Sequence, residues 1–165
     1  MKIFLASALF LMTCMPAIAA DDAATQHATD FATKAALSNM FEIEVAKIEL
    51  SKGKAVDAKE FARDMLRDHE RAGPLLAEAA KQDGIPTPAE LDSQRRRKVE
   101  ALQTADPENL DQAYLSTQVT AHQEAVALFD QFVKEGPDGQ LKKTAAKILP
   151  DLHMHLTRVQ AIAGK

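Results

Sequence analysis

The sequence predicts an all-α fold, a bundle of four long helices, and three observations lead to this class. Helix-forming residues, alanine above all, run through nearly the whole chain, whereas Val and Thr never form the alternation typical of a strand. Apolar residues recur at spacings of three and four over long segments. Glycine and proline gather at a few places between these segments, where helices would end.

The first twenty residues are expected to be a signal peptide and no part of the fold. A positive start, an apolar run over residues 3–13 and small residues after a proline are its three parts. The apolar run is too short to span a bilayer. Cleavage after Ala19 or Ala20 would export residues 21–165 as a single domain to the periplasm or the medium. A lipid anchor on Cys14 fits less well, because the residue before it is threonine.

Each predicted helix is bounded by residues that start or stop helices. Gly53 and Gly84 can cap the C-terminal ends of the first two helices. Asp106 and Pro107 suit the start of the third. His27 would then precede the first helix. The four helices are expected at about residues 29–52, 56–83, 108–135 and 138–162.

The connections between these helices indicate the topology. The first and second helices, and the third and fourth, are joined by tight turns, so each pair is expected to be an antiparallel hairpin. The middle link is long and holds a short extra helix from about Pro88 to Gln103, with Thr87 as its N-cap. Only this link can cross the bundle lengthwise, which predicts parallel second and third helices and a ferritin-like connection.

Three of the four predicted helices carry one histidine in an otherwise apolar face. His69, His122 and His155 each lie near the middle of their helix, so the three are expected at a similar depth. Two positions along a helix differ by about 200° in direction, so His153 should point outward if His155 points inward. The pattern therefore predicts convergence of three imidazoles from three helices.

Carboxylates lie where they could complete such a site. On the first helix, Glu42 and Glu44 flank the apolar stripe on opposite sides, and periodicity leaves both open. Asp68 and Asp151 are candidates to orient the histidine rings from outside the ligand set. Three imidazoles and one carboxylate would suit a single zinc, copper or iron ion.

Other site classes match the sequence poorly. The dinuclear iron bundles require Glu-x-x-His motifs, and Leu66 and Leu152 stand where two of those glutamates would be. No cysteine remains after the expected cleavage, and no phosphate-binding or dinucleotide-binding glycine pattern occurs. The net charge of −4 argues against nucleic acid as a partner, and the basic run at residues 95–98 is interpreted as a solvated helix face. No catalytic residue is assigned.

Four stretches resemble a known family: "MFEIEVAKIEL" from Met40, "FARDMLRDH" from Phe61, "YLSTQVTAHQEAVALF" from Tyr114 and "LPDLHMHL" from Leu149. They are similar to the exported bacterial ferritin-like proteins of domain-of-unknown-function family 4142, whose members are often labelled outer membrane proteins. The resemblance implies a four-helix bundle and export, but no activity. It places an acid at Glu42, an Asp-His pair at Asp68 and His69, and histidines at His122 and His155.

Two hypotheses about function follow from the sequence. The leading one is a periplasmic bundle that binds a transition-metal ion in its core and has a binding or stress-protective role, rather than an enzyme. The alternative is a structural or interaction protein of the cell envelope, with a protein partner or an oligomeric state of its own, whose core histidines serve packing or pH sensing without metal.

Overall fold

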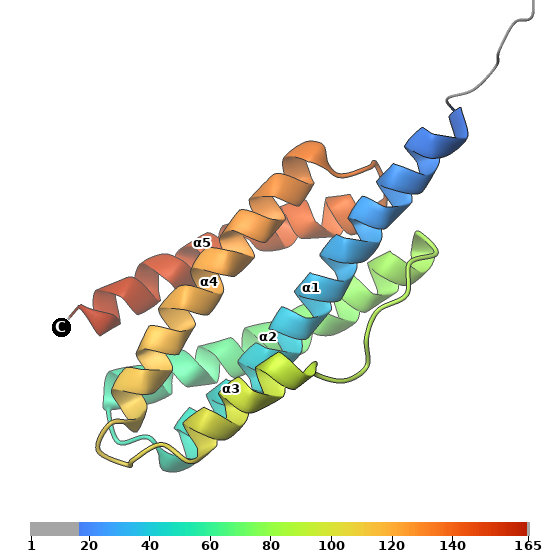
Figure 1. Cartoon of the computed structure of the whole chain (residues 1–165). Helices are drawn as coiled ribbons and strands as arrows, with labels where there is room; N and C mark the ends of the chain where they lie inside the picture. Colours follow the sequence, from blue (N-terminus) through green and yellow to red (C-terminus); the bar gives the residue numbers. More distant parts are fainter. Residues whose placement is uncertain (1–16, 165) are drawn as a thin grey trace, which may run out of the picture.

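The computed structural model describes the backbone of residues 17–164 and the side chains of residues 22–164. This part of the chain contains helices and no strand, which confirms the all-α prediction (Figure 1). The expected signal peptide falls largely outside the described residues, including Cys14; Ala19 and Ala20 lie in the first turn of the first helix. The five helices are α1 (Ala17–Lys52), α2 (Val56–Gln82), α3 (Ser93–Gln103), α4 (Leu110–Glu135) and α5 (Gln140–Ala163).

Helices α1 and α4 pack side by side and run antiparallel. Phe31, in the first half of α1, stacks on Phe132 near the end of α4, with ring centroids 3.8 Å apart. Further along, Gln118 Nε2 donates to Glu42 Oε2 over 2.5 Å. Residue numbers therefore fall along α4 as they rise along α1.

Helix α2 packs along α5, also in the opposite direction. Arg158 donates to Asp64, and Arg71 lies 3.6 Å from Asp151. Since α1 and α2 form one hairpin and α4 and α5 another, α2 and α4 run parallel, as predicted from the long middle link (Figure 1). The crossover with α3 carries the chain back along the bundle.

Two helix starts differ from the sequence prediction. Helix α1 begins at Ala17 instead of about residue 29. An alanine-rich stretch without Gly or Pro continues the helix there, and His27 packs edge-on against Phe132 with centroids 5.5 Å apart. The crossover helix begins at Ser93 because Asp92, rather than Thr87, accepts the Arg95 N–H over 2.7 Å.

Two aspartates tie the ends of the bundle together across helices. Asp83, which follows α2, accepts the N–H groups of Gln140 and Leu141 at the start of α5 over 2.9 and 2.7 Å. At the opposite end, Asp111 of α4 accepts those of Lys54 and Ala55 in the α1–α2 turn. Helices α2 and α5 lack a side-chain cap from their own N-cap residues, so these long-range contacts satisfy backbone groups there.

The buried core is divided into two apolar halves by a polar layer. One half surrounds Phe31 and Phe132, and the other surrounds Phe61 and Met65. The buried polar residues at the boundary come from all four long helices. They are Asn39, Glu42, His69, Gln118, His122 and His155.

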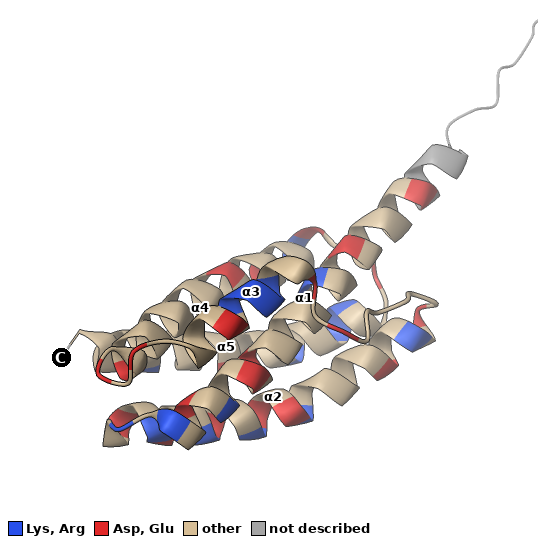
Figure 2. Ribbon diagram, turned by 60° about the horizontal axis from the view of Figure 1, so that its bottom comes forward, with Lys and Arg blue, Asp and Glu red and all other residues tan. Residues whose placement is uncertain are grey.

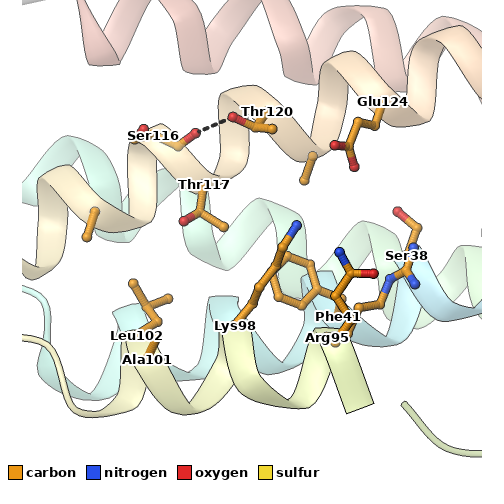
Figure 3. A pocket seen from close by; sticks show the side chains of 13 residues that line it. Ser38, Phe41, Arg95, Lys98, Ala101, Leu102, Ser116, Thr117, Thr120 and Glu124 are labelled. Atoms are coloured by element: carbon orange, nitrogen blue, oxygen red, sulfur yellow. Dashed lines mark hydrogen bonds between the residues drawn. The ribbon is translucent and has the colours of Figure 1, made fainter. Parts of the chain in front are cut away.

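Helix α3 leaves part of the α4 surface uncovered. It packs more closely on α1 than on α4. A cleft of about 460 Å³ remains between α3 and α4, with Phe41 of α1 at its floor (Figure 3). Charged residues of both signs are spread over the helices, and basic residues are prominent on α3 (Figure 2).

Candidate metal centre

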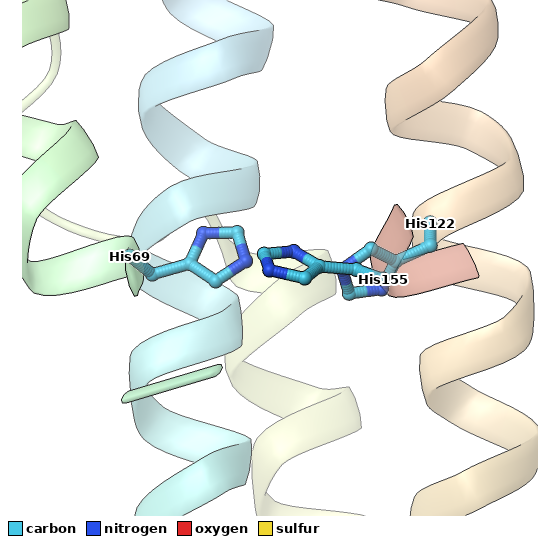
Figure 4. Close-up of side chains that lie close together, drawn as sticks. All are labelled: His69, His122 and His155. Carbon is cyan, nitrogen blue, oxygen red and sulfur yellow. The ribbon is translucent and has the colours of Figure 1, made fainter. Parts of the chain in front are cut away.

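The three histidines predicted from the sequence meet in the polar layer (Figure 4). His69 comes from α2, His122 from α4 and His155 from α5, and their exposed fractions are 7, 1 and 4%. The ring centroids lie 5.5 to 6.0 Å apart. Each residue offers one ligand atom, and these atoms lie within 4.8 Å of one another. The predicted convergence is confirmed, and we call these residues the histidine cluster.

Each ring of the histidine cluster has one nitrogen bonded to an acceptor. Nδ1 of His69 lies 3.1 Å from Asn39 Oδ1, and Nδ1 of His122 lies 3.0 Å from the Gln118 carbonyl oxygen. Nε2 of His155 lies 3.1 Å from an Asp68 carboxylate oxygen. Carbonyl and carboxylate oxygens only accept, so these three nitrogens carry the protons when the rings are neutral.

The second nitrogen of each ring is buried and without a hydrogen-bond partner among the described residues. These atoms are His69 Nε2, His122 Nε2 and His155 Nδ1. With the proton on the opposite nitrogen, each presents a lone pair. Buried polar atoms normally have a partner, so three such lone pairs on one cluster point to a ligand or an ordered water.

Burial keeps two of the rings neutral. It lowers the pKa of His69 to about 3, and the nearby His122 and His155 act in the same direction. Burial and His122 also lower the pKa of His155, although the Asp68 carboxylate opposes them. A metal ion requires unprotonated imidazole nitrogens, so the environment favours the protonation state needed for coordination.

The two glutamate candidates occupy different surroundings. Glu42 is 2% exposed and its Oε1 has no hydrogen-bond partner, with His122 Nδ1 3.9 Å away. Burial raises its pKa, against opposing effects of His122 and Gln118. Glu44 lies at the surface and pairs with Lys47 over 3.0 Å. The structure therefore places Glu42 beside the histidine cluster and Glu44 away from it.

The aspartates have other partners than the sequence suggested. Asp151 is half exposed and pairs with Arg71; it makes no hydrogen bond to His155, although its charge acts to raise the pKa of His155. Asp68 orients His155 instead of its neighbour His69, because consecutive helix residues point about 100° apart and Asp68 faces α5. Burial alone would raise the pKa of Asp68, but hydrogen bonds from Arg67 and His155 lower it, so a carboxylate faces the ring.

Two residues with important contacts were not predicted. Asn39 orients His69. A Cβ added at Gly73 would lie 2.7 Å from the amide nitrogen of Asn39, so the glycine makes room for the asparagine side chain. Gln118 bonds Glu42 through its side chain and His122 through its carbonyl. A polar residue one helical turn before His122 was the available signal for Gln118.

Solvent approaches the histidine cluster between α2 and α5. A cleft of about 160 Å³ there is lined by Asp68, His69, Asp151 and His155 among others. A neighbouring cavity of about 20 Å³, also lined by His69, touches Glu42 and His122 and has room for one water molecule. The cluster is thus buried yet adjacent to a surface opening.

The histidine set can coordinate one ion, since its three neutral nitrogens would leave a fourth position open. Tetrahedral ligands about 2.0–2.1 Å from zinc lie about 3.3 Å from one another. The histidine ligand atoms, which lie within 4.8 Å of one another, would have to approach to that spacing. His153 is exposed on α5, as helical phase predicts, and does not contribute.

Comparison with known proteins agrees with the fold and identifies the family. The chain is similar in structure to the crystal structure of a DUF305 fragment from Deinococcus radiodurans, with a TM-score of 0.71 and 15% identity over 84% of this chain and 95% of that chain. At this identity the likeness shows the fold alone. No curated protein matches the sequence. The model of the family "Domain of unknown function (DUF4142)" matches residues 13–162, and the chain belongs to that family.

Proposed function

We propose that this protein binds a single transition-metal ion through His69, His122 and His155, in a binding or protective role. The observation that carries the proposal is the hydrogen bonding of the rings. All three use one nitrogen toward an acceptor and leave the other buried and without a partner among the described residues, and one ring nitrogen from each histidine lies within 4.8 Å of the others. Metal-ligating histidines show this pattern, in which a carbonyl or carboxylate outside the ligand set fixes the tautomer.

The donor set favours a borderline metal such as zinc, copper or iron over calcium or magnesium, which require oxygen ligands. Three neutral imidazoles carry no charge, so only the nearby acidic groups, Glu42 and Asp68, could offset an ion. One divalent ion suits this balance better than two. We therefore propose a mononuclear centre with Glu42 beside His122 and Asp68 bonded to His155, and the proposal includes no catalytic step.

We also propose that the protein is exported and that its bundle is ferritin-like. The signal-peptide pattern at the start of the sequence supports export. The parallel α2 and α4, joined by a crossover along the bundle, support the ferritin-like arrangement. Within residues 17–164, no helix has the length and apolar character needed to cross a membrane.

The test is metal titration of the metal-free protein with Zn²⁺ and Co²⁺, followed by calorimetry and visible absorption. A tetrahedral Co²⁺ site should give intense visible bands. Replacing His155 with alanine should weaken binding by more than the roughly 10–100-fold that loss of an outer partner costs. His153→Ala is the matched control, because His153 lies two residues away on the same helix and is exposed.

Equal affinity of wild type and His155→Ala for every metal tried would contradict the proposal. The alternative, a structural bundle without metal, has one observation in its favour. The cavity of about 20 Å³ beside His69 and His122 has room for a water that could satisfy two of the lone pairs. That alternative predicts no specific Co²⁺ spectrum.

A further inference from the structure

The cleft between α3 and α4 is a second concave site. Its volume of about 460 Å³ lies within the roughly 300–1,000 Å³ of small-molecule pockets. Residues of α1, α3 and α4 line it, and the histidine cluster does not. The crossover helix therefore creates a pocket that the proposed metal centre does not use.

The floor and one wall of this cleft differ in chemistry. Phe41 and Leu102 form an apolar floor and are only 4 and 5% exposed. On the α4 wall, the hydroxyl groups of Ser116, Thr117 and Thr120 line the cleft (Figure 3). Thr120 donates its hydroxyl proton to the Ser116 carbonyl over 3.2 Å. Such a surface can contact an apolar body and a polar head group together.

The opposite wall provides a positive charge. Lys98 extends from α3 toward the hydroxyl groups of α4 (Figure 3), and within residues 22–164 it makes no ion pair. Arg95, one turn earlier, already pairs with Asp92 over 2.6 Å. Lys98 is therefore the cation available to a ligand, on the prominently basic α3 of an otherwise acidic chain (Figure 2).

One carboxylate limits the charge that a ligand can carry. Glu124 also lines the cleft, on the wall formed by α4 (Figure 3). Its charge would repel a second negative group, whereas a single carboxylate can lie toward Lys98. The cleft thus favours monoanions over dianions such as phosphate near neutral pH.

We propose that this cleft binds a small organic monocarboxylate. The carboxylate meets Lys98 and the hydroxyl groups of Ser116 and Thr117, and a short apolar or aromatic body covers Phe41 and Leu102. Charge-assisted hydrogen bonds orient the head group. Burial of the apolar body supplies most of the affinity.

The test is an NMR titration of the metal-free protein with benzoate, benzyl alcohol and inorganic phosphate. Benzoate should shift backbone amides of α3 and α4 saturably, with the largest shifts around residues 98 and 117. Benzyl alcohol lacks the charge and phosphate lacks the apolar body, so each should bind more weakly. Replacing Lys98 with methionine should weaken benzoate binding about fivefold.

The control is Arg97→Met, which removes an equal charge from an exposed position on α3 outside the cleft. Its benzoate affinity should equal that of wild type. Thr117→Phe fills the cleft and keeps Lys98, so it should also weaken binding. The proposal fails if benzoate leaves the cleft amides unshifted, if Lys98→Met binds as wild type does, or if phosphate binds as well as benzoate. Because no metal is present, these results are independent of the proposed metal centre.

Discussion

Two buried polar regions of this bundle avoid charge in opposite ways. In the histidine cluster at mid-height, burial lowers the pKa of His69 and of His155, so these two bases stay neutral by giving up a proton. Near the α1–α2 turn, Glu49 is fully buried beside Asp111, and burial together with that carboxylate raises the pKa of Glu49 to about 8. We call Glu49 and Asp111 the carboxyl pair. Its buried acid stays neutral by keeping a proton.

The two regions also differ in what their unpartnered atoms could accept. The histidine cluster has three unpartnered ring nitrogens, and His69 and His122 line a small cavity. The Glu49 carboxyl group is packed tightly, and a Cβ added at Gly53 would lie only 2.1 Å from its Oε1. Neutral lone pairs beside a cavity suit a metal ion, whereas a packed, protonated carboxyl suits a structural role.

The two buried regions make the stability of the fold depend on pH in opposite ways. The pKa of His69 is lower in the folded state than in the unfolded state. Its contribution to the free energy of unfolding is therefore present above about pH 6.5 and is lost as pH falls toward 3. The pKa of Glu49 is higher in the folded state than in the unfolded state. Its contribution to the free energy of unfolding is therefore present below about pH 4.5 and is lost as pH rises through 8. Between about pH 4.5 and 6.5 the two slopes oppose each other.

The largest expected effect comes from removing the titration of His69. His69→Gln keeps a neutral polar side chain that cannot gain a proton. Between pH 6.5 and 4, the excess stability of wild type over this variant should shrink by about 3 kcal/mol. Urea unfolding at both pH values measures it. The exposed His153→Gln serves as control, and a His69→Gln difference that does not change with pH would contradict the assignment.

The second largest effect is expected at Glu49, where the change of stability with pH has the opposite sign. Glu49→Gln removes the proton that the folded state holds, so this variant should gain stability relative to wild type as pH rises from 5 to 7, by about 2 kcal/mol. Urea unfolding across that range tests it. Glu44→Gln, at the exposed pair with Lys47, should show no such trend. Parallel curves for wild type and Glu49→Gln would mean that Glu49 is ionised when folded.

The part of the site that follows helical periodicity could be predicted from the sequence. His69, His122 and His155 interrupt apolar faces near mid-helix, and the bundle brings mid-helix positions to one level. The long middle link likewise indicated the parallel α2 and α4. These features depend on spacing along one helix or on the length of a connection.

The contacts between helices could not be predicted in the same way. Which carboxylate orients His155 depends on the rotation of α2 against α5, and Asp151 on the same helix looked as suitable as Asp68. On α4, Gln118 and Ala125 are buried whereas their apolar neighbours Val119 and Val126 are only partly buried, and Gln118 faces Glu42 of α1. Tertiary packing decides such choices among neighbouring positions.

The third prediction separates the two aspartates near His155. If a metal binds, Asp68→Asn should weaken its affinity about tenfold, since it removes the carboxylate that holds the Nε2 proton. Asp151→Asn should weaken the affinity much less, because Asp151 pairs with Arg71 and makes no hydrogen bond to His155, on which only its charge acts. Competitive titration with a chromophoric zinc chelator measures both. Equal losses in the two variants would show a general effect of acidic charge instead.

The smallest effect on stability is expected at Gly73, and it distinguishes positioning from packing. In Gly73→Ala the added Cβ would lie 2.7 Å from the amide nitrogen of Asn39, which is the movable end of a side chain. The gain of about 1 kcal/mol from alanine in a helix offsets that displacement, so the free energy of unfolding should stay within about 1 kcal/mol of wild type. Metal affinity should nevertheless fall severalfold, because Asn39 no longer orients His69.

The same substitution at Gly53 brings the Cβ 2.6 Å from a backbone oxygen, which cannot move as easily. Gly53→Ala should therefore reduce stability more and leave metal affinity unchanged, and the opposite result for either variant would contradict the division between the two buried regions.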